Sequence, residues 1–504
     1  EADQGFATAR LQRARLWLDQ YEELRQASGR YARLETAEGL SLAEKIRADL
    51  KEVQAWSKDD REVTFAAGAL AFVEGDNGKA SQALEEYSKL TLSDFRGWEW
   101  TAHAWLHVPG METRAIRAID EAMKYRPRLP SLLVFRGMAR LQQASRLKRH
   151  LETDTAAQLR TAAMGDFRAA REIDPLDSGA HRGLGEACLE SGEGNLAAVH
   201  FTRAIELGPK VSAAFVGRAR SRFRDGNLSG ALADSEEALR LGSPDPKAYL
   251  IRGRVRCAQE DFVGALSDLN LALELDPGET EAMIGLGDLK RERGDPSGAI
   301  ADYDRAIAVD PVLAEAFHHR GNAQRELGHG DLEIQDLNRA LKLDRGNPGI
   351  HFDRGVWACN RGEWSEAITD FRKGLARMPS DPWPFWMHLW MARSHLGESE
   401  AARAELETSA GDLPHAIPEN PRSTLVALLL GRMPIGVFLE SLDRIPRSRG
   451  EMAQALFYAA EKARTDGDLP LARTLLQRCI KMKAVTTPVD STAASDLRRI
   501  PAPH

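Results

Sequence analysis

Residues 314–347 read AEAFHHRGNAQRELGHGDLEIQDLNRALKLDRGN, and they contain one complete copy of a unit that recurs along the chain. Apolar and small residues recur within it at spacings of three and four, which marks one face of a helix. Gly328 lies where a first helix must stop and the chain must reverse. The same landmarks return every 34 residues, in repeats that start at Ser178, Ser212, Pro246, Thr280, Ala314, Pro348 and Pro382. This period predicts an all-α array of helix pairs.

The pattern resembles the tetratricopeptide repeat. The resemblance is carried by the stretch Phe317–Gly321, by Gly328 and by the stretch Asp336–Asp344, and it covers most of the chain. The repeats are similar to bacterial-type repeats that contain Arg-Gly and Asp. The resemblance implies a right-handed α-solenoid, a superhelix of about eleven helix pairs with an N-terminal helical cap. It also implies a concave face, lined by the first helix of each pair, that binds other polypeptides.

The repeats divide the chain into segments of different character. Residues 1–57 lack the period and read as long charged helices, which suit a terminal cap, a connector to an upstream domain or a dimerising helix. The remaining expected segments are divergent repeat-like units at 58–177, one with a 14-residue insertion, a regular array at 178–411, a non-repeat helical or loop segment at 412–450, a terminal repeat-like unit at 451–485 and a disordered tail at 486–504.

Composition narrows the class of partner. The 68 Lys and Arg residues are spread among 75 Asp and Glu residues, with no long basic block, so we expect no nucleic-acid partner. The longest apolar stretch, Leu425–Leu430, is far shorter than the roughly 18 residues of a membrane-spanning helix, and we expect no membrane insertion within the chain. We expect a cytoplasmic location. The chain begins with Glu1 rather than Met, which is compatible with an upstream targeting or catalytic segment, and its oligomeric state does not follow from the sequence.

Numbered from the first residue of each repeat, position 7 carries arginine in five repeats and position 23 carries aspartate in the same five. Pairing within a repeat gives every arginine an acidic partner, whereas pairing with the preceding repeat places Arg218 opposite His200. We therefore predict structural ion pairs within repeats, not a catalytic row. The predicted pairs are Arg136 with Asp166, Arg218 with Asp234, Arg252 with Asp268, Arg320 with Asp336, and Arg354 with Asp370. Only Asp302 lacks its arginine, because Leu286 takes that place.

Positions 2, 5, 9 and 12 of the first helices are expected to line the concave groove. The candidate groove residues are Arg220, Lys247, Arg254, Asp288, Arg291, His318, Asn322, Arg325, Phe352, Trp383, Trp386 and Trp390. Such a groove is basic near its middle and aromatic near residue 385, which suits a peptide with acidic and apolar side chains. The alternative is that the charged residues are ordinary solvated side chains and that the tryptophans pack on the segment 412–450.

Signals for chemistry are weak. His103 and His107 have a helical spacing that can hold zinc, but the sequence marks no third ligand. We expect no catalytic residue, no metal and no cofactor, and hence no enzyme. The sequence indicates a scaffold or adaptor that binds peptide segments or domains of other proteins. Two alternatives stay open: a C-terminal regulatory or recruitment region of a larger enzyme of the kinase or glycosyltransferase type, and a self-assembly module.

Overall fold

The computed structural model describes residues 2–27, 37–91, 94–108, 110–149, 153–208, 212–241, 245–377, 382–410, 421–444, 448–482 and 488–500. These residues form 27 α-helices and no β-strand, which confirms the prediction of an all-α fold. No helix in this part of the chain is both long enough and apolar enough to cross a bilayer. The chain divides into two compact bodies, an N-terminal body of Glu1–Ala282 and a C-terminal body of Met283–His504.

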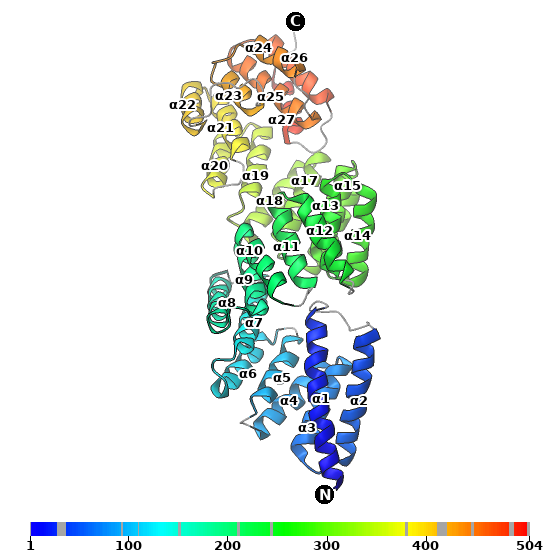
Figure 1. Cartoon of the computed structure of the whole chain (residues 1–504). Coiled ribbons are helices and arrows are strands. Elements are labelled where there is room, and N and C mark those ends of the chain that lie inside the picture. Colours follow the sequence, from blue (N-terminus) through cyan, green and yellow to red (C-terminus); the bar gives the residue numbers. More distant parts are fainter. Residues whose placement is uncertain are drawn as a thin grey trace. The chain divides into compact units, whose positions relative to one another are not determined.

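The N-terminal body is built from consecutive helices that pack as antiparallel pairs (Figure 1). Its helices are α1 (Ala2–Ala27), α2 (Ala37–Trp56), α3 (Asp60–Glu74), α4 (Asn77–Leu90), α5 (Phe95–Leu106), α6 (Glu112–Tyr125), α7 (Pro130–Arg149), α8 (Thr153–Ile173), α9 (Ser178–Ser191), α10 (Gly194–Leu207), α11 (Ser212–Arg224), α12 (Leu228–Arg240), α13 (Pro246–Ala258) and α14 (Phe262–Leu275). Helices α1 and α2 pair with each other and both contact α3, as a helical cap would.

The insertion predicted in the repeat before Ser178 is absorbed by longer helices. Helices α7 and α8 contain 20 and 21 residues, whereas α11 and α12 contain 13 each. They form the most extensive helix pair of the body. The extra residues therefore lengthen both helices of the pair. The following repeat, which starts at α9, still packs on this pair as a helix pair.

The C-terminal body continues the helix pairs and adds helices of other kinds. It contains α15 (Thr280–Glu292, which begins just before the boundary), α16 (Pro296–Val309), α17 (Ala314–Glu326), α18 (Gly330–Leu343), α19 (Pro348–Arg361), α20 (Trp364–Leu375), α21 (Trp383–His395), α22 (Ser399–Ala410), α23 (Pro421–Leu429), α24 (Ile435–Arg444), α25 (Arg449–Thr465), α26 (Leu469–Lys481) and α27 (Pro488–Arg499). Helices α23 and α24 lie in the non-repeat segment and pack on α25.

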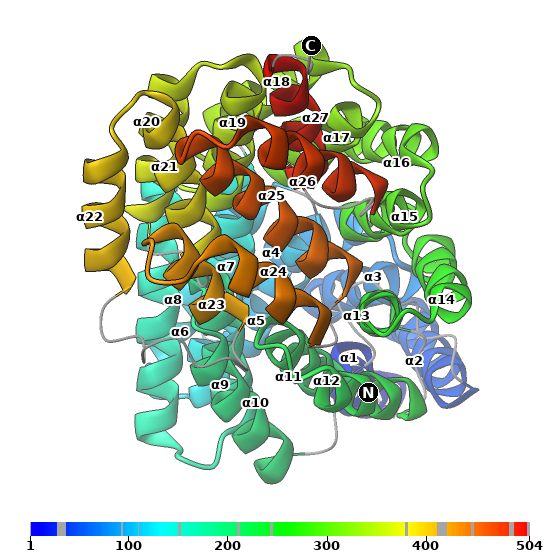
Figure 2. The ribbon, with the colours of Figure 1, turned by 90° about the horizontal axis from the view of Figure 1, so that it is seen from above.

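The prediction that residues 486–504 form a disordered tail is wrong for residues 488–500. Of these, Pro488–Arg499 form α27, which packs on α19, α25 and α26 (Figure 2). Ala493 of the helix and Ile500 directly after it are buried, and Arg499 donates to the carbonyl oxygen of Asn360 at 2.9 Å. A short helix gains most of its stability from such tertiary contacts, which composition does not reveal. Residues 486, 487 and 501–504 lie outside the described residues.

Two kinds of glycine position the repeats. Gly226 ends α11 at φ 77° and lets the chain reverse into α12 without the steric penalty of a Cβ atom. Gly217 serves close packing instead, because a Cβ atom there would lie 2.3 Å from Cζ of Phe201 on the preceding repeat. The ring of Phe201 is fully buried between the two repeats. Small residues thus set the distance between neighbouring pairs, and that distance fixes which side chains of adjacent first helices can meet.

Candidate functional site

Three of the candidate groove residues on α17 converge on one carboxylate of α19. Nε2 of His318 lies 2.6 Å from Oδ2 of Asp353, and the amide of Asn322 donates to the same oxygen at 3.1 Å. Nη1 of Arg325 donates to Oδ1 of Asp353 at 2.9 Å. The three donors occupy positions 5, 9 and 12 of their repeat, and the acceptor lies at position 6 of the next. This polar cluster joins two consecutive first helices of the C-terminal body.

Electrostatics hold Asp353 in its charged form. Burial alone would raise the pKa of this carboxyl, but the charge of Arg325 and the hydrogen bond from His318 outweigh it and lower the pKa. Glu333 on α18 behaves oppositely. Its Oε1 lies 3.7 Å from Nη1 of Arg325, and burial, only partly offset by that arginine, raises the pKa of Glu333 to about 7. At neutral pH the cluster therefore contains one firmly ionised acid and one acid near its midpoint.

A second polar cluster surrounds Asp288 on α15. The hydroxyl of Tyr303 donates to Oδ1 of Asp288 at 2.7 Å, and Nδ1 of His319 lies 2.6 Å from the same oxygen. Burial lowers the pKa of His319, but the carboxylate of Asp288 outweighs it and the net pKa is raised. Nearby, Nε of Arg291 lies 3.8 Å from Oε1 of Glu326. The candidate groove residues of α15 and α17 are thus engaged in contacts within the body.

The aromatic candidates lie against the core of the C-terminal body. Trp390 is only 3% exposed and belongs to the same apolar cluster as Leu425 and Leu428 of α23. Trp383 and Trp386 are partly buried against that cluster. The remaining aromatic candidate, Phe352, packs edge-on against Phe385 with ring centroids 5.0 Å apart and against His388 at 4.8 Å. Replacing Trp390 would therefore test the stability of the fold more than the binding of a partner.

The three candidates in the N-terminal body have different surroundings. The guanidinium of Arg254 on α13 lies 5.1 Å from the ring centroid of Phe223 on α11, and its Nη1 lies 3.5 Å from Oε2 of Glu281. Lys247, two turns earlier on α13, is exposed, and Arg220, one turn before Phe223, is partly exposed. Within the described residues, neither Arg220 nor Lys247 forms an ion pair. We call Arg220, Lys247 and Arg254 the basic surface: Arg254 pairs with Glu281, whereas Lys247 interacts electrostatically with Asp245 and Glu279 without forming an ion pair in the described part of the chain.

All five predicted arginine–aspartate partners are in contact. In each repeat, Nη2 of the position-7 arginine lies 2.7 Å from Oδ1 of its aspartate. The other terminal nitrogen of the guanidinium, Nη1, makes contacts that the sequence analysis did not predict. In four of the five, all but Arg252, Nη1 contacts position 25 of the preceding repeat, as in Arg320 to Asp304 at 2.6 Å and Arg354 to Asn338 at 2.9 Å. These four arginines thus bridge neighbouring repeats as well as the helices of one repeat.

The repeat that starts at Thr280, in which Leu286 takes the place of the arginine, uses another cation. Nζ of Lys290, at position 11, lies 2.6 Å from Oδ2 of Asp302. Arginine at the same position in three other repeats adds a second donor, with Arg140 to Asp166 at 2.5 Å and Arg222 to Asp234 and Arg256 to Asp268 both at 2.8 Å. A basic residue at position 11 was the sequence signal for this additional partner.

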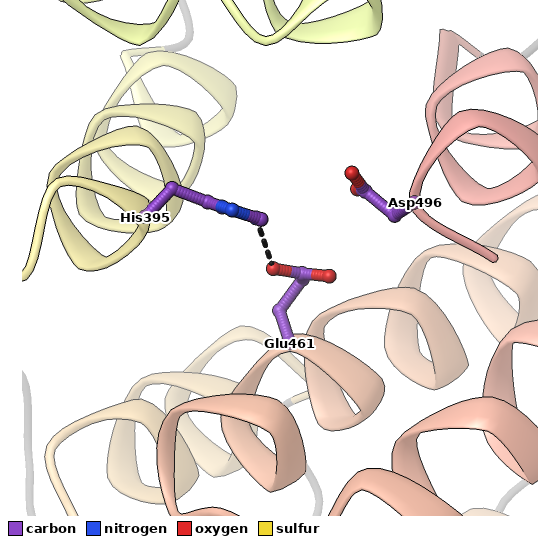
Figure 3. Close-up of side chains that lie close together, drawn as sticks. All are labelled: His395, Glu461 and Asp496. Atoms are coloured by element: carbon purple, nitrogen blue, oxygen red, sulfur yellow. Dashed lines mark hydrogen bonds and ion pairs between the residues drawn. The ribbon is translucent and has the colours of Figure 1, made fainter. Parts of the chain in front are cut away.

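Both histidines of the predicted helical pair lie against aromatic rings. The ring of His103 stacks on Phe135 with centroids 4.0 Å apart, and His107 packs against Phe72 at 5.9 Å. A different group is better suited to hold a metal. His395 on α21, Glu461 on α25 and Asp496 on α27 place ligand atoms within 4.8 Å of one another (Figure 3). Sequence reasoning missed this group, because its three members come from three helices and follow no local spacing.

Comparison with known proteins agrees with the helix-pair fold. A family model described as a tetratricopeptide repeat matches residues 216–280, and one described as a TPR repeat matches residues 287–328. No curated protein matches the chain. Among solved structures, the chain is similar to a tetratricopeptide repeat protein from Parabacteroides merdae, with 18% identity over 50% of this chain and 99% of that chain and a TM-score of 0.40.

Two larger structures cover more of the chain. The APC/C hetero-tetramer Cut9-Hcn1 is 15% identical over 88% of this chain and 96% of that chain, with a TM-score of 0.46. The human IFIT1 dimer with m7Gppp-AAAA is 16% identical over 86% of this chain and 97% of that chain, with a TM-score of 0.47. At these identities the likeness concerns the fold alone.

Proposed function

We propose that this chain, a tetratricopeptide-repeat protein with repeats recognised over residues 216–280 and 287–328, is a scaffold that binds an acidic, partly apolar peptide segment of another protein. Repeats of this kind typically serve as non-catalytic interaction surfaces. The binding site we propose is the basic surface of the N-terminal body, formed by Arg220, Lys247 and Arg254 on α11 and α13.

The observation that carries this proposal is a contrast between candidate groove residues of the two bodies. Arg220 and Lys247 have no ion-pair partner within the described residues. Arg325, a candidate groove residue of the C-terminal body, pairs with Asp353. A cation that the fold leaves unpaired can attract an acidic side chain without breaking an internal contact. The basic surface is therefore better suited than the polar clusters of the C-terminal body to receive a partner.

The surface also offers apolar contact. Arg254 lies over the ring of Phe223, so the surface offers a partner an apolar ring beside its positive charge. Both helices are held by packing between repeats, so the side chains that they carry start from a fixed backbone. This preorganisation lowers the entropy cost of ordering an extended peptide.

The test is a selection of random displayed peptides on the immobilised full chain, followed by affinity measurement by fluorescence anisotropy. We expect the selected peptides to be enriched in Asp and Glu and to bind the variant Arg220→Glu/Lys247→Glu about tenfold more weakly or worse. The matched control is Arg203→Glu/Arg240→Glu, which reverses two exposed arginines on the second helices of the same body. Peptides without acidic enrichment, or equal binding to both double variants, would refute the proposed site.

A further inference from the structure

His395, Glu461 and Asp496 meet inside the C-terminal body, where α21, α25 and α27 come together (Figure 3). Glu461 is 0% exposed and Asp496 is 1% exposed, so the group differs from an ordinary acidic patch on a surface. Nε2 of His395 lies 2.9 Å from Oε2 of Glu461. The imidazole ring is held by stacking on Trp364, with centroids 3.8 Å apart and planes 14° apart, and this packing directs Nε2 toward the two acids.

In each carboxylate, one oxygen accepts a hydrogen bond and the other has no hydrogen-bond partner within the described residues. Oε2 of Glu461 contacts His395 and accepts from Nε of Arg464 at 3.0 Å. Oδ1 of Asp496 accepts from Nη1 of Arg499 at 2.7 Å. Oε1 of Glu461 and Oδ2 of Asp496 are buried and have no hydrogen-bond partner within the described residues. Figure 3 shows the Asp496 carboxylate pointing into the space beside His395 and Glu461. Buried oxygen acceptors without a partner are rare in folded proteins and call for an explanation.

We infer that His395, Glu461 and Asp496 form a binding site for a divalent transition-metal ion of the zinc type. One imidazole nitrogen and two carboxylate oxygens are ligands that zinc accepts, at metal–ligand distances of about 2.0 to 2.2 Å. Ligands around one tetrahedral ion at that distance are about 3.4 Å apart. Atoms that already lie within 4.8 Å of one another need only small side-chain rotations to reach this arrangement. Water would complete the coordination of a site with three protein ligands.

The two arginines define what kind of ion the site takes. Arg464 and Arg499 offset the charge of the acids, so the site lacks the surplus of anionic oxygens on which Ca²⁺ and Mg²⁺ depend. Both arginines donate to one oxygen of a ligand carboxylate and can orient it while the other oxygen faces the ion. Two further hydrogen bonds fix the position of Arg499, which donates to the carbonyl oxygens of Cys359 and Asn360 at 3.2 and 2.9 Å. The ion would tie α27 to α21 and α25.

The test is titration of the full chain with ZnCl₂, with Co²⁺ as a spectroscopic probe and with MgCl₂ and CaCl₂ as competitors. We expect wild type to bind one more Zn²⁺ equivalent than Glu461→Gln or Asp496→Asn, with Co²⁺ absorption bands typical of tetrahedral nitrogen and oxygen ligands. We also expect Zn²⁺ to protect α27 from hydrogen exchange in wild type only. The matched control is Asp466→Asn, which removes a partly exposed acid at the end of α25.

The near-isosteric amides preserve side-chain shape, and circular dichroism checks the helix content of each variant. If one variant loses helix content, the other still reports on the site. Equal Zn²⁺ stoichiometry in wild type and in a folded amide variant would overturn the proposal, as would a signal that Mg²⁺ at the same concentration abolishes. Neither result bears on the peptide surface of the N-terminal body, which shares no residue with this site.

Discussion

Arg325 on α17 and Asp353 on α19 form an ion pair, with Nη1 and Oδ1 2.9 Å apart, and their side chains are only 9% and 11% exposed. In such a buried pair the loss of one partner is more damaging than the pair is stabilising, because it leaves the other charge without compensation. His318 and Asn322 share the same carboxylate, so its removal would leave several buried donors unpaired at once.

We therefore predict that Asp353→Ala destabilises the C-terminal body by about 3 to 5 kcal/mol. Hydrogen-exchange mass spectrometry of peptides from α17 to α19 would measure the local free energy of opening. The control is Asp304→Ala, whose carboxylate pairs with Arg320 but is 53% exposed, and which should cost no more than about 1 kcal/mol. A similar effect of both changes would show that the Asp353 cluster is effectively solvated.

Glu333 should make stability depend on pH in the unusual direction for an acid. Because burial raises its pKa in the folded state to about 7, above its ordinary value, the folded chain holds a proton that the unfolded chain releases. Stability is therefore lost as pH rises from the unfolded pKa through about 7, and it is recovered on acidification. Replacement by Gln removes this dependence, since the amide cannot ionise.

We predict that Glu333→Gln matches wild type near pH 5 and exceeds it by about 2 to 3 kcal/mol near pH 8. Urea unfolding followed by circular dichroism at both pH values would measure the difference. Glu366→Gln, an exposed acid of α20, is the control and should show no such divergence between the two pH values. A constant difference between Glu333→Gln and wild type would mean that Glu333 titrates normally in the fold.

The repeat that starts at Pro246 carries a strained turn. Its position 15 is Glu260, with φ 63°, whereas Gly226 and Gly294 hold the same position in neighbouring repeats at φ 77° and 79°. A residue with a Cβ atom is disfavoured in this left-handed region by roughly 1 to 2 kcal/mol. Glu260 is exposed, so its side chain contributes little packing in return.

We predict that Glu260→Gly raises stability by about 1 kcal/mol, because relief of strain exceeds the added flexibility of the unfolded chain. Thermal unfolding of the full chain would show a higher midpoint. The reverse change in the adjacent repeat, Gly226→Ala, should lower the midpoint by a comparable amount. A lower midpoint for Glu260→Gly would mean that contacts of the glutamate outweigh the backbone strain.

The fold was predictable because its signals are local and repeated. The regular first helices begin at the residues where the 34-residue period places repeat starts, as at Ser212 and Ala314, and α21 begins one residue later, at Trp383. Helix α27 was not predictable, since its stability depends on contacts such as Arg499 to Asn360, 139 residues apart in the chain. Comparing repeats predicts helices and turns well, but it says nothing of a segment that occurs once.

The groove residues were harder to predict for a related reason. Period and position correctly placed His318 and Arg325 on a first helix, but whether such a side chain is open depends on what the next repeat supplies. Asp353 stands where Gly183 and Gly217 stand in earlier repeats, and Glu333 stands where most repeats have alanine. These two departures from the repeat pattern were the signal in the sequence that polar side chains of α17, α18 and α19 contact each other.

The forked arginines have a consequence for how the array melts. Arg320 contacts Asp336 of its own repeat and Asp304 of the preceding repeat. When one of these repeats unfolds, the charged residue that remains in the other repeat therefore loses its ion-pair partner. The coupling between adjacent repeats in a linear array then contains a Coulombic part as well as apolar contact. The number of helix pairs that unfold cooperatively should accordingly depend on ionic strength.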